Sequence, residues 1–493
     1  MTDATELLSI RACIAMFALV ASLTMVAFVL SLPLGEGNDE TNHVIRTASL
    51  LDGRIIGYRR APPVGVDGPG VMESGFDISS SYLDAMQYRP RDSGGRPAPI
   101  TRDDTAARDR LTWGDEIRFA EASNTANYAP FLYVPAALGI AAGRIAQLGP
   151  AASIELGRLF NAMFYVVIGS TALAIATRGR LVILTFLLTP MSLFLASCIG
   201  QDGPIIALAA LASAALARPT NAVQPSRLHW IGIVCLSLIA IAKLPYLPLA
   251  GLVWLAAHRL PTWRWRDALA LGLTVALPVL WAGFAGHETA VPFGRDPYSP
   301  GPLWTGAPDA IFHGTDVAAQ ASVLLADPLR VLTLPILTFI AEFDLMCREV
   351  VGVLSWRDLP LPVWLYAAWY VVILAMVSLD AALPATRREA AHDQRRWLRA
   401  FGAGATLAVC LLGSVLLIYL ALYLSWTSVG AALVAGVQGR YFIPLLLFIP
   451  LALPWRTRSK SRLERLAMLV PLALAVVDSA VLPSLIWARY YMQ

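Results

Sequence analysis

The chain has 493 residues, of which 57% are hydrophobic and 15% are charged, and its mean hydropathy is +0.60. These values predict a polytopic membrane protein and exclude an ordinary soluble enzyme or binding module. The net charge of +4 does not indicate nucleic acid as a partner, because the arginines cluster in short loops between apolar runs. The five cysteines lack the spacing of a metal site or a disulfide framework.

The first apolar run extends from Ile14 to Leu32, which is long enough to span a bilayer core of roughly 30 Å. It lacks a small-residue cleavage site at its end, so we expect a retained span with a cytoplasmic N-terminus. The next stretch, Gly37 to Leu51, predicts an amphipathic helix on the membrane surface, with Asn38 as its N-cap. Its apolar stripe is Val44, Ala48 and Leu51, and its polar face carries Asp39, His43 and Arg46.

We expect residues 33–150 to form a first extracytoplasmic loop with an ordered beginning and end and a mobile middle at about 62–108. A second surface helix is predicted to begin at Tyr128 and to end at Gly149-Pro150. Asp115 and Glu116, in the same loop, form a second acidic pair that competes with Asp39 and Glu40 as a site.

The whole chain, 1–493, is predicted to be one all-α membrane domain of about eleven spans, with its C-terminus outside. The expected spans are 14–32, 151–177, 181–197, 204–217, 228–242, 246–258, 268–285, 362–379, 403–424, 440–454 and 467–487. The loops assigned to the inside are rich in Lys and Arg, which sets the orientation. Residues 286–362 form a second extracytoplasmic segment. Its apolar stretch 332–354 carries four charges and is expected in the interface or against the bundle.

This orientation places several polar residues on the outer face, next to breaks between apolar runs. Asp202 lies in the turn between two spans, and Lys243 precedes a Leu-Pro break. Arg440 follows Gln438 and Gly439 at the outer end of a span, where a guanidinium can bind a phosphate while glycine permits close approach. Arg158, near the start of its span, is a further phosphate candidate, or else the partner of Glu155.

Several of these motifs resemble a known family. The motifs are Asn38–His43, Glu155–Asn161, Thr189–Asp202, Leu354–Trp364 and Val437–Pro444. They are similar to those of a bacterial polytopic membrane family, domain of unknown function 2142. The acidic pair after the first span and the surface helices resemble the GT-C superfamily of membrane glycosyltransferases, which use polyprenyl-phosphate-linked sugars. One departure is Gly37-Asn38, where members of the family of unknown function are expected to have Pro-Pro before the acidic pair. This change alters the helix cap and leaves the carboxylates in place.

The resemblance to GT-C enzymes implies a role for each candidate. Asp39 corresponds to the base that accepts the proton of an acceptor hydroxyl. Glu40 would act as an orienting group or as a metal ligand. His43 would hold the carboxylate or the acceptor, and Arg440 with Gln438 and Tyr441 would bind the lipid phosphate, helped by Lys243 and Arg158. Asp202 would contact the acceptor or complete a divalent-metal site with Asp39. The aromatic candidates for sugar stacking are Tyr128, Tyr133, Trp304, Trp356 and Trp364.

Each role has a simpler alternative. The acidic pair could only complement the helix dipole, Arg440 could be an interface anchor, and the aromatics could form a membrane-interface belt. The expected function is transfer of a sugar from a polyprenyl-phosphate donor to a glycan or lipid-linked acceptor. This transfer would take place at the outer face of the bacterial inner membrane, in cell-envelope polysaccharide synthesis. The alternatives are a transporter or flippase of lipid-linked saccharides and a non-catalytic assembly partner. Membrane lipids are expected partners, and metal dependence stays open.

Overall fold

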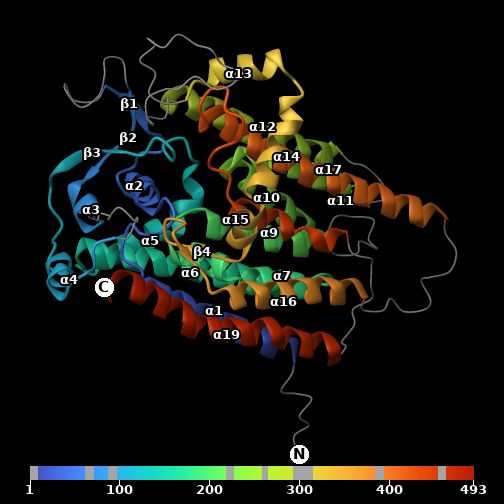
Figure 1. Cartoon of the computed structure of the whole chain (residues 1–493), viewed down its shortest axis with the longest axis horizontal. Coiled ribbons are helices and arrows are strands. Elements are labelled where there is room, and N and C mark those ends of the chain that lie inside the picture. Colours follow the sequence, from blue (N-terminus) through green and yellow to red (C-terminus); the bar gives the residue numbers. More distant parts are fainter. Residues whose placement is uncertain are drawn as a thin grey trace, which may run out of the picture.

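The computed structural model describes residues 9–61, 72–86, 97–217, 227–257, 265–291, 315–382, 394–452 and 462–492. The fold is mostly helical. Helices α1 (Ile10–Ser31), α6 (Pro150–Ile175), α16 (Val363–Ala382) and α19 (Arg462–Tyr490) run along one side of the molecule, with α1 beside α19 (Figure 1). Helices α12 (Trp265–Thr289) and α17 (Gln394–Ser425) lie on the opposite side.

Within the described ranges, these six helices are long and apolar enough to cross a membrane. In α17, the part that meets this test is Gly404–Ser425. Two bent pairs raise the number to at most eight. One joins α7 (Arg180–Leu188) to α8 (Pro190–Ser197) at 59°, and the other joins α13 (Val317–Ala326) to α14 (Arg330–Ala341) at 104°. The chain is therefore a multi-pass membrane protein.

The remaining expected spans are short helical pieces. Two are regular helices, α9 (Asp202–Leu216) and α10 (Arg227–Ala242). The others are interrupted by prolines, which remove backbone donors. They are η2 (Leu244–Ala250) with α11 (Gly251–Ala257), and η4 (Gly439–Phe442) with α18 (Ile443–Leu446) and η5 (Ile449–Leu451). The count of eleven spans stays a prediction. The basic loops at 383–393 and 453–461 and Trp304 lie outside the described residues.

The centre of the bundle is formed by α7, α8 and α9, in which every residue is buried except Asp202. These helices are apolar on all sides, as expected for elements surrounded by other helices. The backbone is broken between α7 and α8 at Thr189-Pro190, since proline cannot continue the hydrogen-bond ladder. Polar residues at the ends of these short helices are thus held at fixed places along the bundle.

The first loop contains a β-sheet, so the all-α expectation was wrong there. The antiparallel strands are β1 (Tyr58–Arg60), β2 (Glu73–Ser79) and β3 (Ile117–Glu121), and Phe76 is paired with Ala120. Strand β2 alternates apolar Phe76 and Ile78 with polar residues, a period of two that favours a half-buried strand. The predicted mobile middle also contains helices α3 (Ser80–Ala85) and α4 (Arg102–Asp109), so it was wrong for those residues. Residues 62–71 and 87–96 of that middle lie outside the described residues.

Both helices predicted in this loop exist, as α2 (Glu40–Leu51) and as η1 (Pro130–Tyr133) followed by α5 (Val134–Ile145). The N-cap position of α2 is occupied by Asp39 and not by Asn38, and the Asp39 side chain makes no capping hydrogen bond. It is buried between the sheet and α5, in a small core with Phe76, Ile140 and Ile154 (Figure 1). An exposed polar face of α2 on the membrane surface was therefore a wrong expectation. Between α15 (Phe343–Val351) and α16, the short strands β4 (Val353–Leu354) and β5 (Leu359–Pro360) form a hairpin.

Candidate functional site

Four charged residues from distant parts of the chain form one cluster, which we call the charged cluster: Asp39, Asp202, Lys243 and Arg440. Arg440 Nη2 lies 3.0 Å from Asp39 Oδ2, and Arg440 Nη1 lies 3.6 Å from Asp202 Oδ2. Lys243 donates a hydrogen bond to Asp202 Oδ1. The side chain of Arg440 is only 4% exposed, whereas that of Asp39 is 36% exposed. The cluster is therefore closed on the Arg440 side and open at Asp39.

Each member of the charged cluster lies at a break in helical structure. Asp39 is the N-cap of α2 and has the left-handed φ of 55°, a conformation that Asp and Asn tolerate better than other non-glycine residues. Asp202 is the first residue of α9, where the helix dipole favours a negative charge. Lys243 lies between α10 and η2, and Arg440 lies in η4. Helix ends rather than helix faces bring these groups together.

The position of Arg440 is held by α15. The N–H of Gly439 donates to Glu349 Oε2 at 2.6 Å, and Arg357 Nε binds the other oxygen of Glu349 at 2.5 Å. A Cβ on Gly439 would lie 2.0 Å from the carbonyl oxygen of Met346, so only glycine permits this approach. In the sequence, Glu349 is one of the four charges in the apolar stretch 332–354. A charge within such a stretch was the available signal of a structural role.

The electrostatics of the charged cluster are balanced, with two carboxylates and two cations. Burial alone would raise the pKa of Asp202, but Lys243 and Arg440 outweigh burial and lower it to about 2. Both cations also lie over the ring of Tyr441, with Lys243 Nζ at 5.0 Å and Arg440 Cζ at 5.3 Å from its centroid. An aromatic face attracts cations in this way. The carboxylate of Asp202 is thus held ionised between the two cations.

His43 borders the charged cluster. Its Nδ1 lies 2.7 Å from the hydroxyl of Tyr133, and its ring stacks on Tyr128 with centroids 6.2 Å apart. Burial lowers the pKa of His43 to about 4, against the opposing effect of the nearby carboxylates Asp39 and Asp202. His43 is therefore neutral at neutral pH, and Tyr128 and Tyr133 fix its ring.

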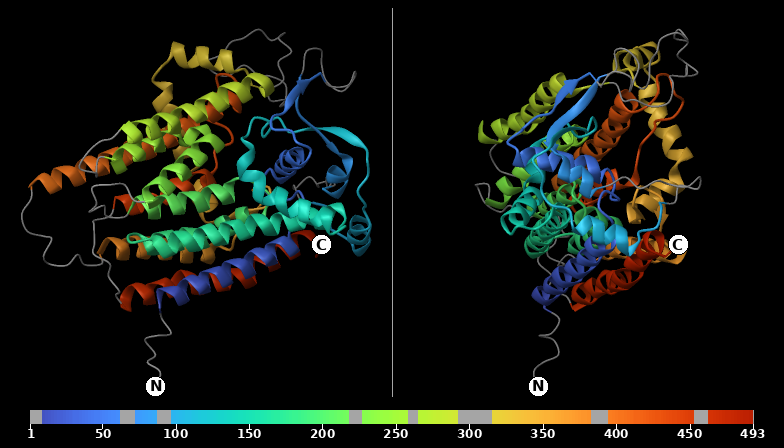
Figure 2. Two further views of the ribbon diagram at one scale, coloured as in Figure 1. Left: turned by 180° about the vertical axis from the view of Figure 1, so that it is seen from behind. Right: turned by 90° about the vertical axis from the view of Figure 1, so that its left-hand side faces the viewer.

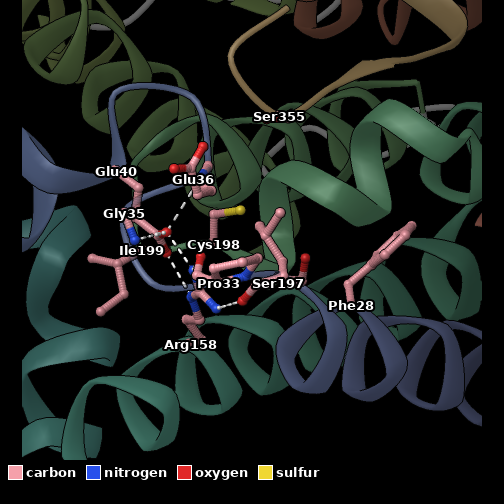
Figure 3. A network of polar contacts seen from close by, with 12 residues as sticks. Phe28, Pro33, Gly35, Glu36, Glu40, Arg158, Ser197, Cys198, Ile199 and Ser355 are labelled. Carbon is pink, nitrogen blue, oxygen red and sulfur yellow. Dashed lines mark hydrogen bonds and ion pairs between the residues drawn. The ribbon is translucent and has the colours of Figure 1, made fainter. Parts of the chain in front are cut away.

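Glu40 and Arg158 form a separate, fully buried pair (Figure 3). The guanidinium binds both carboxylate oxygens at 2.7 and 2.5 Å and also donates to the carbonyls of Leu32 and Pro33. Glu40 further accepts from the N–H groups of Gly35, Gly37 and Ile199. Because these contacts occupy the carboxylate, we reassign Glu40 from catalysis, and Arg158 from phosphate binding, to holding the loop that carries Asp39.

Several buried polar atoms beside the charged cluster have no partner among the described residues. They are the amide N and O of Gln201, Oε1 of Gln438 and Nε of Arg440. Gln201 is fully buried and precedes Asp202. Buried polar atoms are rarely left unpaired, so these groups are candidates for contact with a bound ligand. Sequence reasoning missed Gln201, although its place beside Asp202 was a signal.

The other candidates lie apart from the charged cluster or serve structural contacts. Glu116 binds Arg118 at 2.7 Å on the surface, and Asp115 is exposed. Trp356 Nε1 donates to the carbonyl of Gly35, and Trp364 is 53% exposed. The guanidinium of Arg46 is bound to the carbonyls of Tyr128 and Ile55, away from the face it was expected to share with Asp39. In the described part of the chain, no three His, Cys, Asp or Glu side chains are grouped as a metal site would require.

Comparison with known families gives one match. A predicted membrane protein family, DUF2142, matches residues 23–449. The chain belongs to the DUF2142 family. Comparisons with curated proteins and with solved structures each found no match. All four residues of the charged cluster lie within the matched region of this DUF2142 protein, whereas α19 lies beyond it.

Proposed function

We propose that this DUF2142 protein is a membrane glycosyltransferase of the GT-C type. In this proposal it moves a sugar from a polyprenyl-phosphate-linked donor to a glycan or lipid-linked acceptor in cell-envelope polysaccharide synthesis. The observation that carries the proposal is the contact of Arg440 with Asp39, 401 residues away in sequence. A partly exposed carboxylate beside the buried Arg440, with the partly buried Lys243 in the same cluster, is suited to proton abstraction next to a phosphate.

The phosphate of the donor would bind to Arg440 and Lys243. A guanidinium and an ammonium side by side match the oxygens of a phosphate, and both are held in place by carboxylates and by Tyr441. An incoming phosphate would compete with Asp39 for Arg440 Nη2, because that contact is the most exposed one in the charged cluster. Gln201 and Gln438 supply additional buried hydrogen-bonding groups.

Asp39 would act as the general base. Its carboxylate takes the proton of an acceptor hydroxyl, the acceptor oxygen bonds to the anomeric carbon, and the bond from that carbon to the phosphate oxygen breaks. The leaving polyprenyl phosphate keeps the electron pair, and its charge is stabilised by Arg440 and Lys243. Fixed charges directed at developing charge are usually the largest catalytic contribution. His43, being neutral, would orient the acceptor by hydrogen bonding.

The number of spans and their orientation in the membrane belong to the same proposal. The proposed topology comprises a GT-C-like arrangement of eleven spans, an N-terminus in the cytoplasm of a bacterial cell, and the charged cluster at the outer face of the inner membrane. It is supported by the Lys- and Arg-rich sequence of the loops that this orientation assigns to the cytoplasm.

The test is sugar transfer by purified protein in liposomes with a set of polyprenyl-phosphate sugars. Asp39→Asn preserves side-chain size and tolerates the left-handed backbone, so it removes the base and its charge beside Arg440 while the fold is kept. We expect turnover to fall by about 10²-fold or more, and Arg440→Ala to raise the donor KM as well as lower turnover. Asp115→Asn, on the exposed loop, is the matched control. Unchanged transfer by Asp39→Asn would refute the assignment of the base.

A second candidate, a carrier of lipid-linked saccharides, is favoured by one observation. Asp478 is fully buried within α19 and accepts a hydrogen bond from Trp369 Nε1 at 3.0 Å. Ionisable groups within spans often mark transport pathways. In the same liposomes, a carrier would move labelled lipid-linked saccharide between leaflets without forming a new glycosidic bond. That movement would depend on Asp478 and not on Asp39.

A further inference from the structure

A cavity of about 790 Å³ lies away from the charged cluster. One wall is formed by the last turn of α1, including Val29 and Leu30, together with Trp487 and Tyr491 at the end of the chain. The other wall is formed by α3 and α4 of the first loop. Figures 1 and 2 show α4 beside the ends of α1 and α19, next to the C-terminus. The volume is within the range of ligand sites, roughly 300 to 1,000 Å³.

The apolar wall lies where a lipid would meet the protein. Helix α1 is a candidate span that ends at Ser31, so its last turn is at the membrane boundary. Leu30 is 72% exposed. Trp487 and Tyr491 are stacked with ring centroids 4.3 Å apart. Stacked Trp and Tyr at the end of a span are typical of the level of lipid headgroups.

On the polar wall, one acidic and one basic side chain make no hydrogen bond or ion pair with the described residues. Asp104 forms a capping box with Thr101, the N-cap of α4, and Arg108 binds Asp109 and Glu155. The structure gives Asp84 and Arg102 no hydrogen bond or ion pair with any described residue. Arg118 interacts electrostatically with Asp84, but its guanidinium is hydrogen-bonded to Glu116. Arg102 occupies the first turn of α4, where a cation opposes the helix dipole, so helix stability does not explain it.

We propose that this cavity is a binding site for a zwitterionic phospholipid whose headgroup carries a phosphate and a primary ammonium. Arg102 binds the phosphate, Asp84 binds the ammonium, and the acyl chains follow the exposed edge of α1. The opposite charges on one wall and the apolar surface on the other match both parts of such a lipid. The site is independent of the transferase proposal, because it shares no residue with the charged cluster.

The test measures bound lipid by native mass spectrometry of the full-length protein, released from nanodiscs of equal phosphatidylethanolamine and phosphatidylglycerol. We expect the wild type to retain phosphatidylethanolamine preferentially. Asp84→Asn should abolish this preference, and Arg102→Gln should reduce retention of both lipids by about threefold or more. Asp103→Asn and Arg110→Gln are controls of matched charge, since both residues are exposed on or next to α4 and do not line the cavity.

Three outcomes would overturn the proposal. Equal retention of both lipids by the wild type would show that the ammonium is not recognised. A dependence on Arg102 alone, with phosphatidylglycerol preferred, would identify an anionic lipid instead. Loss of lipid in the controls as well as in the variants would show a general effect of surface charge. Because none of these variants touches the charged cluster, sugar transfer measured in parallel reports separately on the proposed activity.

Discussion

At the scale of single residues, the environment decides which of several similar groups is free to react. Asp39 and Glu40 are adjacent in sequence, yet Glu40 is fully buried against Arg158 whereas Asp39 is partly exposed beside Arg440. His43 is one turn further along α2, and burial keeps its imidazole neutral. The acidic pair therefore divides into one fully buried, structural carboxylate and one that is partly exposed to solvent.

His43 makes stability depend on pH. Its pKa is about 4 in the folded protein and near 6.5 when unfolded, so between these values only the unfolded state takes up the proton. The free energy of unfolding therefore falls as pH decreases through this window, by about 3 kcal/mol in total. We expect the wild type to lose more thermal stability in detergent between pH 7 and pH 4.5 than His43→Gln.

The control for this experiment is His287→Gln, because the side chain of His287 is 81% exposed. That variant should follow the wild-type pH profile. Parallel profiles for the wild type and His43→Gln would contradict the assignment of the titration to His43.

At the scale of elements, the first loop is anchored to the bundle through side chains that reach across elements. The Glu40–Arg158 pair joins α2 to α6 and to the end of α1, and Glu349 joins α15 to η4. Both carboxylates are buried, so each needs its partners to offset the loss of hydration. The charged cluster depends on these ties, because they hold the segments that carry Asp39 and Arg440.

Removing Arg158 should therefore destabilise the protein strongly. Arg158→Met leaves the buried charge of Glu40 uncompensated, and we expect a loss of about 3 to 5 kcal/mol in the free energy of unfolding. Glu40→Gln together with Arg158→Met removes that charge while keeping an acceptor for the backbone N–H groups. The double variant should regain part of the loss in denaturant titrations.

The comparison variant is Arg118→Met, which breaks an exposed pair with Glu116 and should change stability by less than about 1 kcal/mol. If the double variant is no more stable than Arg158→Met, the account of an uncompensated charge is wrong.

At the scale of the whole molecule, the two ends of the chain close one side of the bundle. Helices α1 and α19 lie side by side (Figure 2). The carbonyl of Tyr490 accepts a hydrogen bond from the N–H of Ile100 in the first loop. The hydroxyl of Tyr490 donates to Glu36 at 2.9 Å and lies 2.5 Å from Ser355 Oγ. The end of α19 thus holds the first loop and the β4–β5 hairpin at the same end of the bundle.

The proposed orientation can be tested by labelling engineered cysteines in intact cells with a membrane-impermeant maleimide. Asp103→Cys on α4 should label, whereas Arg11→Cys at the start of α1 should label only after permeabilisation, because the basic loops favour the cytoplasm. Cys347 is first replaced by serine, since the other native cysteines are buried. Labelling of Arg11→Cys, but not of Asp103→Cys, in intact cells would reverse the orientation.

Local properties of the sequence determined the membrane class, the places of the long helices and the candidate residues at helix breaks. Hydropathy and proline positions act over short stretches, so Asp39, Asp202, Lys243 and Arg440 could be identified from their neighbours alone. Only the tertiary structure decided which of them meet. It also decided that α2 is buried under a sheet, that Glu40 belongs to Arg158, and that Glu349 supports Arg440. Each of these depends on contacts between segments far apart in the chain, whose pairing is set by packing and charge compensation in three dimensions rather than by local pattern.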